Sequence, residues 1–175
     1  AACGGEITLT NTEPEHVETV IQCLLEGGCH VARAGRTITL RAEQPLCGMS
    51  TVRTMPYPGF PTDAQAVLMA ALAGGQGETI FEENIFQSRY RHVSELARMG
   101  ADIRLTGRTA IVRGAPLHGA CVCSTDLRGG AALVVAALNA EGTSRVGELH
   151  HIDRGYDHLE QALRRLGAEI YRKNA

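Results

Sequence analysis

Residues 54–71 have the sequence Thr54-Met-Pro-Tyr-Pro-Gly-Phe-Pro-Thr-Asp-Ala-Gln-Ala-Val-Leu-Met-Ala-Ala71, in which a proline-rich segment turns abruptly into a helix-forming one. The three prolines favour extended backbone, because proline fixes its own φ angle and disfavours helix in the residue before it. Thr62 and Gln65 fit a capping box, which predicts a helix from there to about residue 73. Asp63 then lies in the first turn, where a carboxylate complements the helix dipole by about 0.3–1 kcal/mol. The rigid proline-rich segment before the helix would also suit a catalytic role for the Asp63 carboxylate.

The composition indicates one domain with a real core and no general surface for polyanions. The chain has 175 residues, is 44% hydrophobic and carries a net charge of −2. Its basic residues are sixteen arginines and a single lysine, Lys173. Arginine matters here because its planar fork binds carboxylate and phosphate groups through two parallel hydrogen bonds.

The six cysteines have neither the spacing of a zinc site nor the density of a disulfide-stapled domain, so we expect reduced thiols and no metal. Cys121 and Cys123 fall on one face of an expected strand, where they are expected to pack. The sequence has no signal peptide and no apolar run long enough to span a membrane. We therefore expect a cytoplasmic protein.

Hydrophobic periodicity and turn residues predict alternating strands and helices along the chain. We expect strands over residues 5–10 and 78–81, and hairpins at residues 34–36 and 107–108. The expected helices cover residues 14–26, 62–73, 90–98 and 156–166.

An internal repeat organises these elements. Gly28-Cys-His-Val31 and Gly100-Ala-Asp-Ile103 stand 72 residues apart, as do Gly35 and Gly107, and Gly167-Ala-Glu-Ile170 is a third copy. Asp63 and Asp126, each at an expected helix start, are 63 residues apart. The repeat predicts an α/β fold of βαβαββ units, each a small mixed sheet with helices on one face.

We expect the units to cover about residues 1–53, 54–116 and 117–175. The first lacks its Asp-helix half and the last lacks its closing hairpin. The sequence therefore predicts a piece of a longer protein.

Three helix starts are candidates for an anion site, because free N–H groups and arginine forks both bind phosphates. They contain Asp63, Asp126 with Arg128, and Asp153 with Arg154. Simple capping could explain Asp126 and Asp153. An arginine in a first helical turn opposes the helix dipole, so it needs an anion or a carboxylate partner.

Arg89, just ahead of the expected helix at residues 90–98, is a third arginine candidate. We assign Arg91 to the surface and His92 to packing. His150 and His151 are expected to point to opposite sides of an extended segment. None of these three histidines is given a catalytic role.

Four motifs, in this order, resemble the UDP-N-acetylglucosamine 1-carboxyvinyltransferases, which are enolpyruvyl transferases. They are Pro56-Tyr-Pro-Gly-Phe-Pro-Thr-Asp-Ala-Gln65, Phe86-Gln-Ser-Arg-Tyr-Arg-His-Val93, Thr125-Asp-Leu-Arg-Gly-Gly-Ala-Ala-Leu133 and His151-Ile-Asp-Arg-Gly-Tyr156. The resemblance covers nearly the whole chain. It implies two lobes, each an inside-out α/β barrel of three βαβαββ units, with this chain forming most of the C-terminal lobe.

The resemblance also implies a reaction. The family transfers the enolpyruvyl group of phosphoenolpyruvate to the 3′-hydroxyl of UDP-N-acetylglucosamine and releases phosphate, in the first committed step of peptidoglycan synthesis. It thereby serves cell-wall biogenesis, cell shape and cell division, and it is the target of fosfomycin. It needs no metal or other cofactor. The implied partners are the two substrates and the missing N-terminal lobe, with no nucleic acid and no membrane.

Roles for single residues follow from their match to the family motifs. Asp63 is expected to contact the sugar hydroxyl and act as general base, and Arg154 to bind phosphoenolpyruvate. The implied catalytic residues are Asp63, Asp126 and Arg154, and the implied substrate-binding residues are Asp63, Ile85, Arg89, Leu127, Arg128 and Arg154.

The loop cysteine that serves the family as an acid belongs to the other lobe, so the resemblance implies that this chain alone is inactive. Cys29 is no substitute, because the repeat places it at the packing position of Ala101 and Ala168. Three alternatives stay open: an enolpyruvyl transferase with another acceptor, such as shikimate 3-phosphate, a non-catalytic RNA-binding α/β module, and a purely structural lobe whose Asp and Arg residues are inert caps. The negative net charge and the scarcity of aromatic residues argue against RNA.

Overall fold

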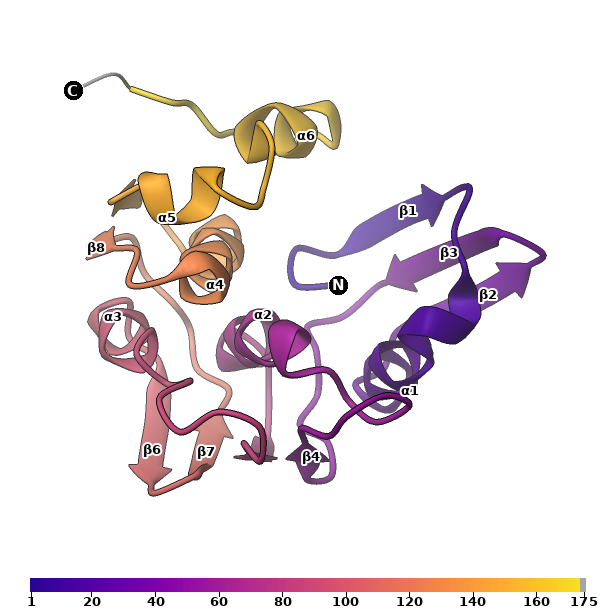
Figure 1. The fold of residues 1–175 in the computed structure, drawn as a ribbon. Coiled ribbons are helices and arrows are strands. Elements are labelled where there is room, and N and C mark those ends of the chain that lie inside the picture. Colours follow the sequence, from indigo (N-terminus) through magenta and orange to yellow (C-terminus); the bar gives the residue numbers. More distant parts are fainter. Residues whose placement is uncertain (174–175) are drawn as a thin grey trace.

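The computed structural model describes residues 1–173 as an α/β fold whose small sheets surround buried helices (Figure 1). The elements are, in order, β1 (Gly5–Leu9), the 3-10 helix η1 (Pro14–Val17), α1 (Glu18–Glu26), β2 (His30–Ala34), β3 (Thr37–Ala42), β4 (Val52–Arg53), α2 (Thr62–Ala73), β5 (Glu78–Glu82), α3 (Val93–Arg98), β6 (Asp102–Thr106), β7 (Thr109–Arg113), β8 (Cys121–Cys123), α4 (Leu127–Asn139), β9 (Arg145–Gly147), α5 (His150–Asp153) and α6 (Leu159–Arg165).

The middle of the chain, from β4 to β7, forms one complete βαβαββ unit. Its strands lie in the order β4-β5-β7-β6. β4 and β5 are parallel and are joined through α2, whereas β6 and β7 form a hairpin whose second strand pairs with β5. The predicted alternation of strands and helices is confirmed here.

The first sheet repeats the second half of that unit. Its order β1-β3-β2 is antiparallel throughout, as is β5-β7-β6. The repeated glycines adopt matching backbone angles: φ is 93° at Gly28, 92° at Gly100 and 94° at Gly167, and 55° at Gly35 and 59° at Gly107. Only glycine adopts such angles without steric cost, which is why the repeat preserves it.

The third repeat begins like the middle one. β8 and β9 pair in parallel across α4, as β4 and β5 pair across α2. Two short helices, α5 and α6, follow, and residues 168–173 contain no strand.

The core lies where α2 packs against α4, and Figure 1 shows both helices at the centre with the strands outside them. Met69 in α2 and Leu133 in α4 are completely buried, as is Phe81 in β5. Helices that are apolar on every side must be buried, and their many alanines permit close approach. The sequence-based prediction of an inside-out α/β fold is confirmed.

The predicted capping box at the start of α2 is wrong. Pro61 occupies the N-cap position and makes no side-chain cap bond. The Thr62 hydroxyl instead donates to Glu83 Oε2 (3.0 Å), and Gln65 is completely buried. A hydrogen bond to Glu83, which is distant in sequence, thus takes the place of the expected local capping bond.

Two helices begin three residues later than predicted. The helix expected from residue 90 begins at Val93, because Tyr90 belongs to the preceding turn and its hydroxyl lies 3.1 Å from Arg108 O and 3.3 Å from Phe81 O. The helix expected from residue 156 begins at Leu159, after His158 with φ of 44°.

Side-chain placement corrects two further expectations. Cys121 and Cys123 do share a strand face, but that face is exposed, because the intervening Val122 points into the core. His150 and His151 lie in α5, not in an extended segment, and their ring centroids are 4.0 Å apart. All six cysteines are free thiols, and Cys29 is buried as expected.

Candidate active site

Asp63 lies in the first turn of α2, at the end of the proline-rich segment. That segment folds back on itself, since Met55 N donates to Phe60 O (3.0 Å) and Gly59 N to Pro56 O (2.8 Å). Pro61, with φ of −72°, then leads directly into the helix. The Asp63 side chain remains 55% exposed at the N-terminus of an otherwise buried helix. It is therefore accessible to a ligand.

Asp126 caps α4. Its Oδ1 accepts hydrogen bonds from Arg128 N (3.0 Å) and Gly129 N (2.8 Å), and its backbone is extended. The capping interpretation is thus confirmed for Asp126. It is wrong for Asp153, which is the last residue of α5 and binds both Nη atoms of Arg172 (2.9 and 2.7 Å).

Two arginines hold the Asp63 carboxylate. Arg128 Nη2 donates to Oδ2 (2.5 Å) and Arg89 Nη2 donates to Oδ1. The hydrogen bond from Arg128 is the largest effect on the pKa of Asp63; partial burial opposes it, and the hydrogen bond from Arg89 and the charges of both arginines add to it, so the pKa lies below its usual value. Asp63 is therefore ionised and able to accept a proton, but it is a weak base while both guanidinium groups stay in place.

Aromatic side chains support both arginines. The Arg128 guanidinium lies 5.7 Å from the Tyr156 ring centroid, and its Nη1 donates to the Tyr156 hydroxyl (3.1 Å). The Arg89 guanidinium lies 5.1 Å from the Phe86 ring centroid. Such contacts between cations and aromatic faces are worth about 0.5–1 kcal/mol at exposed sites and fix the plane of the guanidinium.

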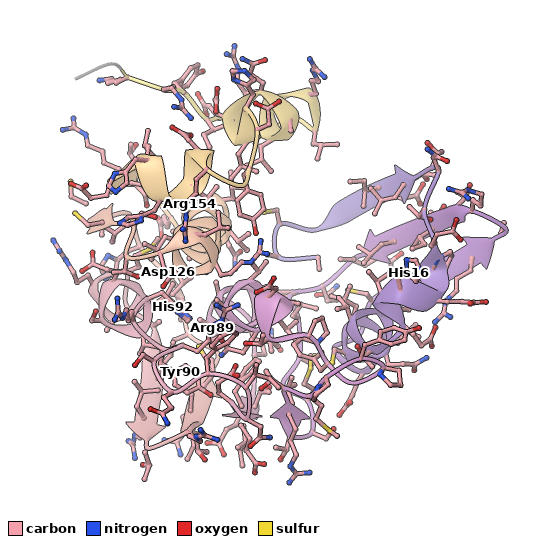
Figure 2. All side chains as sticks on the ribbon, in the orientation of Figure 1. His16, Arg89, Tyr90, His92, Asp126 and Arg154 are labelled. Carbon is pink, nitrogen blue, oxygen red and sulfur yellow. The ribbon has the colours of Figure 1, made fainter. Side chains whose placement is uncertain are left out.

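An open pocket of about 440 Å³ lies beside these groups. Figure 2 shows Arg154, Asp126 and Arg89 following one another along this side of the molecule. The residues that line the pocket are Asp63, Phe86, Gln87, Ser88, Arg89, Arg91, Asp126, Leu127, Arg128 and Arg154.

The pocket has an excess of positive charge, because its lining includes four arginines and two aspartates. Arg89 and Arg128 are neutralised in part by Asp63. Arg91 and Arg154 form no ion pair with any residue in the range 1–173. These two arginines are available to an anionic ligand.

Six of the seven residues singled out from the sequence line this pocket. Ile85 does not, although it is 38% exposed and adjoins Phe86, which does. Sequence reasoning missed Phe86, Gln87, Ser88 and Arg91, although all four lie within a motif used for the family resemblance. Their position within that motif could have identified them as pocket residues.

His92 lies behind the pocket and is completely buried. Neither ring nitrogen has a hydrogen-bond partner among residues 1–173. Burial lowers the pKa of His92 to about 4, although the nearby Asp126 charge acts in the opposite direction. The neutral ring fills space, in agreement with the packing role expected for it.

A smaller pocket of about 220 Å³ lies between η1–α1 and the proline-rich loop. Its lining includes Glu15 and Glu18 and no arginine, so it lacks the positive charge of the larger pocket. Within residues 1–173, no group of three or more histidine, cysteine or acidic side chains is arranged to hold a metal ion. No helix in the same range is both long and apolar enough to cross a membrane.

Comparison with known proteins gives consistent relatives. A family model described as EPSP synthase (3-phosphoshikimate 1-carboxyvinyltransferase) matches residues 1–173. A UDP-N-acetylglucosamine 1-carboxyvinyltransferase of Desulfofundulus thermocisternus is 49% identical over 98% of this chain and 71% of that relative. One of Magnetococcus marinus is 48% identical over 98% of this chain and 41% of that relative.

A solved structure is similar as well. The crystal structure of the enolpyruvyl transferase NikO from Streptomyces tendae superposes with a TM-score of 0.84 and 26% identity, over 95% of this chain and 40% of that one. The chain thus spans about two fifths of the length of most of these proteins. The family match over residues 1–173, together with these identities, shows that the chain belongs to the enolpyruvyl transferase family that includes the UDP-N-acetylglucosamine 1-carboxyvinyltransferases.

Proposed function

We propose that this chain is part of a cytoplasmic enzyme that transfers the enolpyruvyl group of phosphoenolpyruvate to the 3′-hydroxyl of UDP-N-acetylglucosamine and releases phosphate, the first committed step of peptidoglycan synthesis. The observation that carries the proposal is the pocket in which four arginines surround two aspartates. Relatives at 48–49% identity that bear the name of this activity support the choice of acceptor.

The charge of the pocket suits phosphoenolpyruvate, which carries a carboxylate and a phosphate. Arg154 and Arg91, which have no ion pair within residues 1–173, bind these anionic groups. The same arginines stabilise phosphate as it leaves.

Asp63 is the proposed general base. An acid outside this chain protonates the methylene carbon of phosphoenolpyruvate, so positive charge develops at C2, and Asp126, which lines the same pocket, stabilises it. Asp63 takes the proton of the sugar hydroxyl as the hydroxyl oxygen bonds to C2. The tetrahedral adduct then loses a proton from the new methyl group together with phosphate, which restores the carbon–carbon double bond.

The arginines bound to Asp63 regulate its basicity. The pKa of Asp63 stays low as long as Arg128 and Arg89 donate to it. An anionic substrate competes with Asp63 for these guanidinium groups. Substrate binding thereby raises the pKa of the base when it is needed.

We also propose that residues 1–175 belong to a single lobe, with repeats at about residues 1–53, 54–116 and 117–175, and that a second lobe completes the site. The chain spans 41% of the Magnetococcus relative, which leaves room for that lobe. The isolated chain then lacks half of each substrate site and the acid, so it does not turn over.

The test is phosphate release by the full-length protein, given phosphoenolpyruvate and either UDP-N-acetylglucosamine or shikimate 3-phosphate. Release with the UDP-sugar alone supports the proposal, and release with neither acceptor refutes it. Shikimate 3-phosphate is the second candidate, because the family model carries the name of that activity. Release with this acceptor alone assigns the chain to that activity instead.

A further inference from the structure

Glu83 is a buried carboxylate at the edge of the site that the sequence did not point to. It directly follows β5, and Thr54 directly follows the parallel strand β4. Glu83 is 1% exposed and Thr54 is completely buried. The carboxyl ends of parallel strands lie at one edge of a sheet, so these two side chains meet there.

Four hydrogen bonds converge on this carboxylate. Oε1 accepts from Thr54 Oγ1 (2.9 Å), Ile85 N (2.9 Å) and Phe86 N (3.0 Å), and Oε2 accepts from Thr62 Oγ1 (3.0 Å). We call Glu83 and these four donors the Glu83 hub. All four donors are neutral, and Glu83 forms no ion pair within residues 1–173. A buried carboxylate is costly unless it is hydrogen-bonded, which these four donors achieve.

The hub joins the two segments that carry the Asp63–Arg89 pair. Thr62 immediately precedes Asp63, and Phe86 begins the pocket-lining segment that includes Arg89. Arg89 closes a ring, since its Nε donates to Thr62 O (3.4 Å) while its Nη2 donates to Asp63. Movement of either segment must stretch the bonds to Glu83.

The third repeat shows that the fold alone does not require such a hub. Ser124 follows β8 as Thr54 follows β4, and the strand-end bonds match: Ser124 N to Gly147 O is 3.1 Å and Thr54 N to Glu82 O is 3.0 Å. Glu148, at the position of Glu83, is 59% exposed. The Ser124 hydroxyl has no hydrogen-bond partner in residues 1–173. The same half-unit therefore forms without a buried carboxylate.

We infer that Glu83 is a positioning residue, whose buried carboxylate ties the start of α2 to the 84–89 segment and so sets the distance between Asp63 and Arg89. The inference rests on the proposed function, in which both residues serve the reaction. Glu83 itself touches no substrate, because it is buried.

The first test measures the hub without substrates. In the full-length protein, amide hydrogen exchange at Ile85 and Phe86 is expected to be slow, and Glu83→Gln should accelerate it at least tenfold, because a neutral amide oxygen accepts more weakly than a carboxylate. Glu82→Gln is the matched control, since Glu82 pairs with Arg53 at the surface (2.6 Å). Equal exchange rates in wild type and Glu83→Gln would overturn the inference.

The second test is kinetic. Misplacement of a reacting group by about 1 Å can lower the rate about 100-fold. We expect Glu83→Gln to lower kcat at least tenfold with a smaller change in KM, and to move the acidic limb of the pH profile upward as Arg89 releases Asp63. Glu82→Gln should leave both within twofold. If Glu83→Gln accelerates exchange but leaves kcat unchanged, the hub does not position Asp63 and Arg89 for the reaction, and the inference is overturned.

A second pair of variants covers the case in which Glu83→Gln fails to fold. Thr62→Val removes one hub bond and keeps the side-chain shape, whereas Thr62→Ser keeps the hydroxyl. We expect Thr62→Val to lower kcat at least fivefold and Thr62→Ser to retain at least half of it. Equal activities would overturn the inference. Should the wild-type protein release no phosphate, the proposed function fails, while the exchange rates at Ile85 and Phe86 still show whether Glu83 holds the 84–89 segment in place.

Discussion

Asp126 has a structural role and a proposed chemical one, and two substitutions separate them. Its Oδ1 caps α4 through Arg128 N and Gly129 N, and its charge faces the pocket. Asparagine caps a helix as well as aspartate, whereas alanine costs about 1 kcal/mol. Asp126→Asn also loses the interaction of its charge with the helix dipole, about 0.3–1 kcal/mol.

We expect Asp126→Asn and Asp126→Ala to lower activity similarly but to differ in stability. Loss of one preorganised group that stabilises transition-state charge typically costs about 10²–10³ in kcat. We therefore expect Asp126→Asn to lower phosphate release by the full-length protein about 100-fold, although its cap persists. Asp126→Ala should be similarly inactive and, in addition, less stable to heat than Asp126→Asn. If Asp126→Asn keeps kcat within about threefold of wild type, Asp126 is a cap alone and its chemical role is refuted.

Three further predictions concern the same pocket. Asp63→Asn should reduce phosphate release at least 100-fold, the usual scale of general base catalysis, with little change in melting temperature because exposed ion pairs contribute about 0–1 kcal/mol; normal activity would remove Asp63 as the base. Arg154→Gln should raise the KM for phosphoenolpyruvate at least tenfold. It should leave stability unchanged, since Arg154 has no ion pair within residues 1–173. Arg113→Gln, which breaks a surface pair with Glu78 away from the pocket, is the control and should leave this KM unchanged. Arg128 and Arg89 lower the pKa of Asp63 in the folded protein. The contribution of Asp63 to stability is therefore present above the usual aspartate pKa of about 4 and is lost as the pH falls through the lower pKa of the folded state. An Asp63 titration midpoint by NMR at or above about 4 would contradict the ion pairs.

Much of the framework was predictable because it repeats. Gly28, Gly100 and Gly167 need the same left-handed backbone after a helix, so the sequence preserves them and the period becomes visible. Helix starts were less predictable. The Thr62 hydroxyl had a plausible local role as a cap, and only the fold shows that Glu83, 21 residues later, accepts its hydrogen bond instead.

The pocket was predictable in its residues but not in its contacts. Motif resemblance pointed to Asp63, Arg89 and Arg128, yet nothing in the sequence indicated that both arginines bind the same carboxylate. Asp63 and Arg128 are 65 residues apart, and their contact depends on how α2 packs against α4. Such a contact has no periodicity, so no local pattern predicts it.

The two central helices explain why an arginine is tolerated at the start of α4. A cation in a first helical turn is unfavourable, whereas a carboxylate there is favourable. The Asp63 carboxylate, in the first turn of α2, accepts from Arg89 and Arg128 and caps no backbone N–H among residues 1–173. The packing of α2 on α4 thus places a favourable anion where it compensates an unfavourable cation. In the proposed mechanism, an anionic substrate that draws Arg128 away takes over that compensation and, in the same step, frees Asp63 to act as a base.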